Sequence, residues 1–97
     1  MSQDGFSALK DHYSEIIEAM SATFTSHQFI LRLAQQYQAQ YIEMLHDYRD
    51  GPAPFRTVHS ILARHLHSHK ELELVRDDAL STDIFGQPDQ CAQWRKI

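Results

Sequence analysis

The stretch that decides the predicted fold is Asp50-Gly51-Pro52-Ala53-Pro54, together with the run FRTVHSILARHLHSHK at residues 55–70. Proline cannot continue a helix and glycine reaches positive φ easily, so residues 50–54 end any helix before them. In the run that follows, apolar side chains recur in steps of three or four residues, at Phe55, Val58, Ile61, Leu62 and Leu66. This spacing predicts an amphipathic helix over residues 55–68, with these side chains facing the core.

The same spacing predicts helices before residue 50. Residues 6–24 are expected to form one helix, because their apolar side chains keep the helical period. These side chains are Phe6, Leu9, Tyr13, Ile16, Ile17, Met20 and Phe24. Thr25 and Gln28 then have the spacing of a capping box, which predicts a second helical start. The period continues to Tyr48 and leaves open whether residues 26–49 form one helix or two that bend near Gln35 to Gln38.

After residue 70 the pattern changes from helical to strand-like. Residues 72–76 are short and partly alternating, and residues 91–97 are expected to pair with them, so residues 72–97 are predicted to form a β-hairpin. Residues 77–90 contain Gly86 and Pro88 and are expected to be a loop around Ile84 and Phe85. The predicted fold class is mainly α with a small C-terminal β-hairpin, in a single domain, since 97 residues support one modest core.

Charge is distributed unevenly along this acidic chain. The formal net charge is −4, yet residues 51–70 contain no Asp or Glu and hold Arg56, Arg64 and Lys70. Four of the seven histidines lie in the same segment: His59, His65, His67 and His69. A helix with such a face attracts anions at pH 7, and more strongly as the histidines protonate near their ordinary pKa of about 6.5. Nucleic acid is the first candidate ligand.

The sequence lacks the patterns of several functional classes. Its longest apolar runs are two to three residues, so no membrane-spanning helix is expected, and no signal-peptide pattern is present. Cys91 is the only cysteine, which fits a reducing, cytoplasmic location. With no Gly-rich phosphate loop and no nucleophile elbow, we expect neither an enzyme nor a cofactor. His65 and His69 share a helix face without further ligands beside them, so no metal site is predicted.

The order of elements resembles the winged helix-turn-helix class of DNA-binding domains. Helical regions are followed by a two-stranded hairpin, and the helix ahead of the hairpin is basic and free of acids. The resemblance covers most of the chain and implies a winged-helix-like domain whose helix at residues 55–68 enters the major groove of duplex DNA. It also implies that the hairpin touches the DNA backbone or minor groove. The expected function is regulation of transcription or of another DNA transaction.

The expected DNA contacts come from the basic segment, with arginine and lysine on phosphates and with histidine and serine near base edges or backbone. These candidates are Arg56, His59, Ser60, Arg64, His67 and Lys70. About three neutralised phosphates give a monomer only a weak hold, so a homodimer is expected. The candidate residues for a dimer or partner interface are apolar or aromatic, types that are enriched in interface cores. They are Ile16, Ile17, Met20, Tyr37 and Tyr41.

The alternative function is a non-catalytic protein-interaction module of the same fold. Its acidic surface would bind a basic partner or mimic DNA, as the net charge of −4 favours. The acids concerned are Asp47, Asp50, Asp77, Asp78, Asp83 and Asp89. Their position distinguishes the two functions. Acids beside Arg56 and Arg64 would cancel the basic segment and favour protein binding, whereas acids on the far side would leave DNA binding intact.

Overall fold

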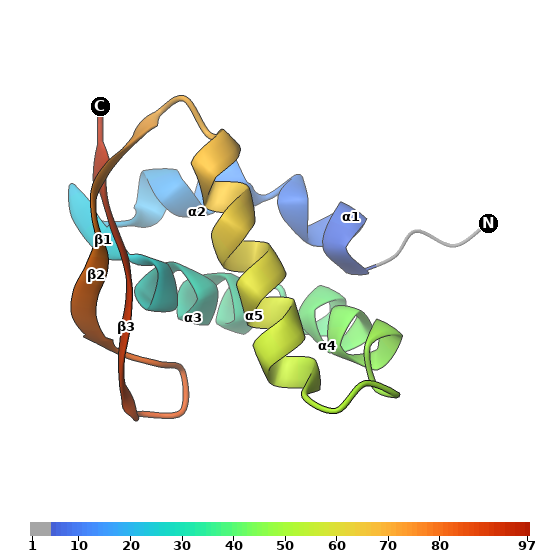
Figure 1. Ribbon diagram of the computed structural model, residues 1–97. Coiled ribbons are helices and arrows are strands. Elements are labelled where there is room, and N and C mark those ends of the chain that lie inside the picture. Colours follow the sequence, from blue (N-terminus) through green and yellow to red (C-terminus); the bar gives the residue numbers. More distant parts are fainter. Residues whose placement is uncertain (1–4) are drawn as a thin grey trace.

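Helix α5 (Pro54–His65) begins directly after the predicted stop signal in the computed structural model, which describes residues 5–97 (Figure 1). Pro54 stands in the first turn, where its missing N–H leaves no helical hydrogen bond unmade. The helix continues into one 3₁₀ turn, η1 (Leu66–Ser68). Gly51 has no positive φ; among the glycines of residues 5–97 only Gly86 does, at φ 84°. The preceding helix ends at Asp47, several residues before the prolines, and no left-handed glycine caps it.

The N-terminal helical region is split, where the sequence favoured one helix over residues 6–24. Helix α1 (Gly5–Lys10) and helix α2 (Tyr13–Ala19) are separated by a turn in which His12 N–H donates to the Leu9 carbonyl at 3.0 Å. The split lets the two helices pack on different neighbours, α1 on α4 (Gln38–Asp47) and α2 on α3 (Ser26–Gln36). Periodicity is preserved across the turn, which is why the sequence pattern does not reveal it.

Residues 26–49 form two helices rather than one. Helices α3 and α4 meet at Tyr37, whose φ of −125° and ψ of 60° interrupt the helix. The predicted capping box at the start of α3 is confirmed: the Gln28 N–H donates to Thr25 Oγ1 at 3.2 Å, and the Thr25 N–H donates to Gln28 Oε1 at 2.9 Å. The reciprocal pair satisfies two backbone donors that the first turn of a helix leaves open.

The sheet has three antiparallel strands in the order β1-β3-β2. They are β1 (Thr23–Thr25), β2 (Leu72–Thr82) and β3 (Pro88–Lys96). The hairpin pairs from Leu72 opposite Lys96 to Thr82 opposite Pro88. Its strands are therefore longer than expected, because residues 77–82 and 88–90 continue the ladder and leave only residues 83–87 as the turn. Phe24 belongs to β1, opposite Trp94, instead of ending the first helix.

The core lies between the sheet and the helices. Two buried polar contacts anchor it: Trp94 Nε1 donates to Ser26 Oγ at 3.0 Å, and the Tyr13 hydroxyl donates to the Leu62 carbonyl at 2.6 Å. The fully or nearly fully buried apolar residues come from both layers, and they include Leu9, Ile16, Ile17, Phe24, Phe29, Leu33, Met44, Val58, Leu62 and Leu66. Residues 5–97 thus form one mainly helical domain. Within this range, no helix combines the length and apolar content needed to cross a bilayer.

Candidate functional site

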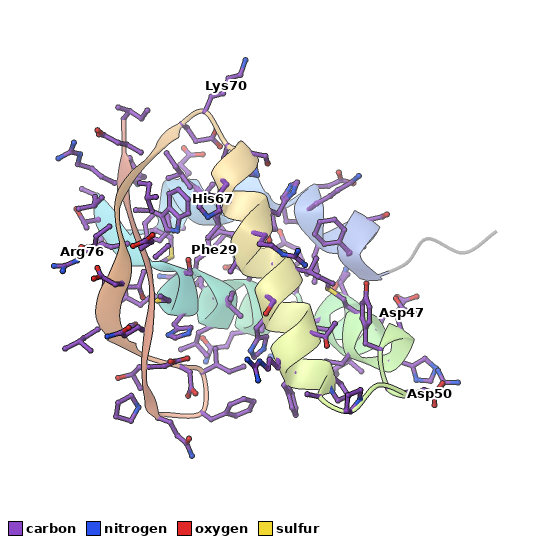
Figure 2. The ribbon with its side chains drawn as sticks, viewed as in Figure 1. Phe29, Asp47, Asp50, His67, Lys70 and Arg76 are labelled. Carbon is purple, nitrogen blue, oxygen red and sulfur yellow. The ribbon has the colours of Figure 1, made fainter. Side chains whose placement is uncertain are left out.

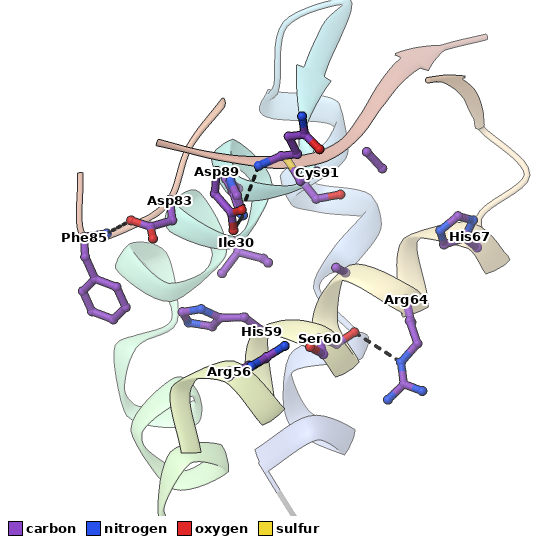
Figure 3. A pocket seen from close by; sticks show the side chains of 15 residues that line it. Ile30, Arg56, His59, Ser60, Arg64, His67, Asp83, Phe85, Asp89 and Cys91 are labelled. Atoms are coloured by element: carbon purple, nitrogen blue, oxygen red, sulfur yellow. Dashed lines mark hydrogen bonds and ion pairs between the residues drawn. The ribbon is translucent and has the colours of Figure 1, made fainter. Parts of the chain in front are cut away.

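A cleft of about 630 Å³ lies between helix α5 and the β2–β3 hairpin, with α3 as its floor (Figure 3). Five of the six predicted nucleic-acid contacts lie in its helix wall, and two predicted acids lie opposite in the hairpin. The helix wall contains Arg56, His59, Ser60, Ala63, Arg64 and His67. The floor contains Ser26, His27 and Ile30, and the hairpin wall contains Asp83, Phe85, Asp89, Gln90, Cys91 and Ala92.

The helix wall presents an exposed basic stripe, defined here as Arg56, Ser60, Arg64 and His67. Spacings of four, four and three residues place these side chains along one face of α5 and of the η1 turn that continues it. Neither arginine has a carboxylate within ion-pair distance among residues 5–97, and Arg64 Nε donates only to the Ser60 carbonyl, at 3.4 Å. The stripe therefore carries two permanent positive charges that no carboxylate of residues 5–97 pairs.

His59 lies on the same helix, but its side chain contacts other residues of the fold, whereas the basic stripe is exposed. Its Nε2 is 2.6 Å from the Tyr41 hydroxyl, and its ring lies 6.1 Å from the Phe85 ring across the cleft. Burial is the main cause that lowers the pKa of His59, nearby His27 lowers it further, and Asp83 opposes the shift. His59 is therefore neutral at pH 7 and held by Tyr41, whose own pKa burial raises to about 12.

The hairpin wall carries the opposite charge. Asp83 Oδ1 accepts from the backbone N–H groups of Phe85 at 2.9 Å and Gln87 at 3.0 Å, and these bonds are the main cause that lowers the Asp83 pKa. Asp89 Oδ1 accepts from the Gln90 N–H at 2.8 Å, and its Oδ2 lies 3.7 Å from His27 Nε2. Asp83 is accordingly ionised at neutral pH, and both carboxylates line the cleft that the basic stripe lines.

Phe85 lines the hairpin wall of the cleft, and the exposed Phe55 packs against it. Phe55 at the start of α5 and Phe85 in the hairpin turn meet edge to face, with ring centroids 4.9 Å apart and an interplanar angle of 81°. They remain 46% and 57% exposed respectively, although they touch each other. Large apolar side chains this accessible at the rim of a charged cleft are available for contact with a ligand.

The remaining predicted residues lie away from the cleft. Lys70 follows η1 at the turn into β2, and Asp47 and Asp50 lie near the end of α4, distant from the hairpin strands (Figure 2). Asp77 and Asp78 belong to β2 and do not line the cleft.

The histidine pair at the end of α5 takes part in ring packing. The His65 ring meets Tyr13 edge to face at 4.8 Å, and the His69 ring stacks on the same tyrosine at 5.2 Å. His69 Nδ1 also lies 3.2 Å from Glu71 Oε1. Across residues 5–97 no group of three or more potential ligands gathers to hold a metal ion.

The residues proposed for an interface are mostly internal. Ile16, Ile17 and Tyr41 are buried in the domain's own core, and Met20 packs against that core. The Tyr37 ring stacks on His12 at 3.7 Å, and its hydroxyl donates to Glu15. The core thus accounts for the apolar residues that made these positions candidates.

Sequence reasoning missed His27 and Phe85 as parts of the site. His27 is the second residue of α3, and its Nδ1 is buried without a hydrogen-bond partner among residues 5–97. Only the packing of the hairpin over α3 brings His27 to Asp89, and only the short turn brings Phe85 to Phe55. Neither event leaves a local sequence signal, because the contacts join residues far apart in the chain.

The arrangement is suited to holding a ligand that presents both charges. The two arginines of the helix wall and the two carboxylates of the hairpin wall balance, so the cleft has no net permanent charge. No protein-family model matches the chain, and neither a curated protein nor a solved structure matches it. The residues of the cleft are therefore the basis for a functional assignment.

Proposed function

We propose that this chain is a non-catalytic protein-interaction module whose partner docks in the cleft between α5 and the hairpin. One observation carries the proposal: Asp83 and Asp89 line the same cleft as Arg56 and Arg64. Duplex DNA presents one negative charge per about 1.7 Å of its axis, so phosphates beside α5 would also meet the hairpin carboxylates. A polypeptide surface avoids this repulsion, because it can carry both signs of charge.

The apolar rim supports the same proposal. Phe85 is exposed in the cleft wall, and the exposed Phe55, next to Arg56 in the sequence, packs on it. Aromatic side chains and arginine are enriched in the cores of protein–protein interfaces, where they supply buried area and specific contacts. A partner that covers the phenylalanines and satisfies both charged walls would gain apolar burial and electrostatic complementarity together.

The winged-helix resemblance remains part of the proposal. It is supported by the position of α5 directly ahead of a hairpin, with helices before it. Such a fold does not by itself assign a function, because the same architecture serves many kinds of site. The acids of the hairpin distinguish this chain from a domain whose wing lies on phosphates.

Duplex DNA is the second candidate ligand. It is favoured by the basic stripe, which is exposed and whose arginines have no acidic partner among residues 5–97. In that arrangement α5 alone would contact DNA, with Arg56 and Arg64 on phosphates and Ser60 and His67 near base edges.

The experiment that separates the two is a titration of labelled nonspecific duplex DNA, followed by fluorescence anisotropy at low salt. We expect no saturable binding at pH 7.5 or at pH 6, because Asp83, whose pKa is lowered, stays ionised at both values. Saturable binding that weakens with salt and is lost in Arg64→Glu, but kept in the matched control Arg49→Glu, would contradict the proposal. It would assign the cleft to nucleic acid instead.

A further inference from the structure

The cleft has the property that a two-fold symmetric contact requires: its surface is complementary to itself. One wall is positive through Arg56 and Arg64, and the facing wall is negative through Asp83 and Asp89. When two identical clefts meet about a two-fold axis that runs along the cleft, each wall of one copy lies opposite the other wall of its partner. Every positive side chain of such a pair can then face a carboxylate of the other copy.

We infer that the partner of this cleft is a second copy of the same chain, joined in a two-fold dimer with α5 of each copy against the hairpin of the other. The inference rests on the proposed function, since it names the partner of the same site. A uniformly basic partner would be repelled by the helix wall and a uniformly acidic one by the hairpin wall. This chain itself carries a surface with both walls in the required arrangement.

The contacts available to this dimer are both ionic and apolar. Arg56 and Arg64 have no carboxylate partner within residues 5–97, and the Asp89 side chain is 62% exposed, so these charges are open to contacts between copies. Phe85 lines the cleft and Phe55 packs on it, so the symmetric contact would cover this exposed pair in each copy. Because ionic contacts at an exposed rim are screened, the dimer should weaken as salt rises.

The test is a charge exchange between the two walls, measured by sedimentation velocity on the full chain over a concentration series. Arg56→Glu/Arg64→Glu makes the helix wall negative. Asp89→Lys/Gln90→Lys makes the hairpin wall positive and leaves Asp83, which holds the turn, in place. The control Arg32→Glu/Arg49→Glu changes the net charge as much as Arg56→Glu/Arg64→Glu does, on exposed residues outside the cleft. Thermal unfolding of each variant establishes that it folds.

We expect the wild type and the control to dimerise, and each wall variant to dimerise at least about tenfold more weakly. An equimolar mixture of the two wall variants should form a heterodimer, because a negative helix wall then meets a positive hairpin wall. A wild type that stays monomeric at all concentrations and salts would overturn the inference. So would a control that loses dimerisation as fully as the wall variants, or a mixture that fails to associate.

Failure of the dimer can be told apart from failure of the proposed function. If the chain stays monomeric and binds no duplex DNA, a second copy is not the partner, but the proposed protein-interaction module stands. If the chain binds duplex DNA saturably through Arg64, the proposed function as a protein-interaction module is itself contradicted. The two measurements therefore give different outcomes for the two statements.

Discussion

At the scale of single residues, His59 is the side chain through which pH acts on the cleft. It bonds Tyr41 within the fold and lies near the hairpin, and three elements surround it with titratable groups. His27 comes from α3, Tyr41 from α4 and Asp83 from the hairpin turn. Because burial and His27 together outweigh Asp83, the folded protein favours neutral His59.

The lowered His59 pKa predicts that stability falls on mild acidification. The unfolded chain takes up a proton near pKa 6.5, before the folded chain does, so stability is complete above that pH and declines as pH falls toward the lower folded pKa. His65 should also destabilise the folded protein on acidification, since burial lowers its pKa as well. We expect the melting temperature, followed by circular dichroism, to drop between about pH 7 and pH 5.5 in the wild type. His59→Gln/His65→Gln should flatten this dependence; an unchanged slope would contradict the assignment.

Gly5 predicts a second effect at this scale. A Cβ at Gly5 would lie 2.3 Å from the Met44 backbone nitrogen, so α1 and α4 pack too closely for any side chain there. Gly5→Ala should lower the free energy of unfolding by about 1–3 kcal/mol through overpacking. In the control Gly51→Ala the Cβ would be 3.4 Å from the Tyr48 carbonyl oxygen, and the change should stay within about 0.5 kcal/mol. Urea unfolding measures both, and equal losses would argue against close packing as the cause.

At the scale of elements, the sequence predicted the helix starts that are determined by interactions between neighbouring residues. The prolines at 52 and 54 mark the start of α5, and Thr25 with Gln28 marks the start of α3, because these residues act on their own backbone. The turn at residues 11–12 was not predictable in this way, since Leu9 and Tyr13 keep the helical period across it. The reach of the hairpin to Thr82 and Pro88 depends on pairing between distant residues, and so does the placement of Phe24 in β1.

The same distinction applies to the site. Arg56, Ser60, Arg64 and His67 follow from helical spacing along one element, and the sequence predicted them together. That Asp83 and Asp89 lie opposite depends on how the hairpin packs over α3, which no residue pattern encodes locally. The sequence therefore supplied one wall of the cleft, and the tertiary packing supplied the other.

The capping box gives a prediction for α3 as an element. Thr25 Oγ1 accepts from the Gln28 N–H and also lies 2.9 Å from Ser81 Oγ of β2, so it joins the helix start to the hairpin. Thr25→Ala should lower the free energy of unfolding by about 1–2 kcal/mol. Thr23→Ala changes an exposed residue of the same strand and should cost less. Chemical denaturation of the two variants checks this, and equal losses would assign the effect to strand propensity rather than capping.

At the scale of the whole molecule, the arrangement of charge carries more information than its sum. A net charge of −4 describes repulsion from polyanions in general, whereas the cleft combines two arginines with two carboxylates at one site. Removal of the carboxylates should leave a basic helix face flanked by a neutral hairpin. We therefore expect the hairpin acids to set which class of ligand the cleft accepts.

The most direct measurement is the affinity of wild type and Asp83→Asn/Asp89→Asn for the same labelled duplex at low salt. Asparagine keeps an Oδ1 acceptor for the turn N–H groups and removes only the charge. We expect no saturable binding by the wild type and saturable, salt-sensitive binding by the variant, because like charges no longer face the phosphates. Equal binding by the two proteins would contradict the claim that the hairpin acids direct this cleft toward a protein partner.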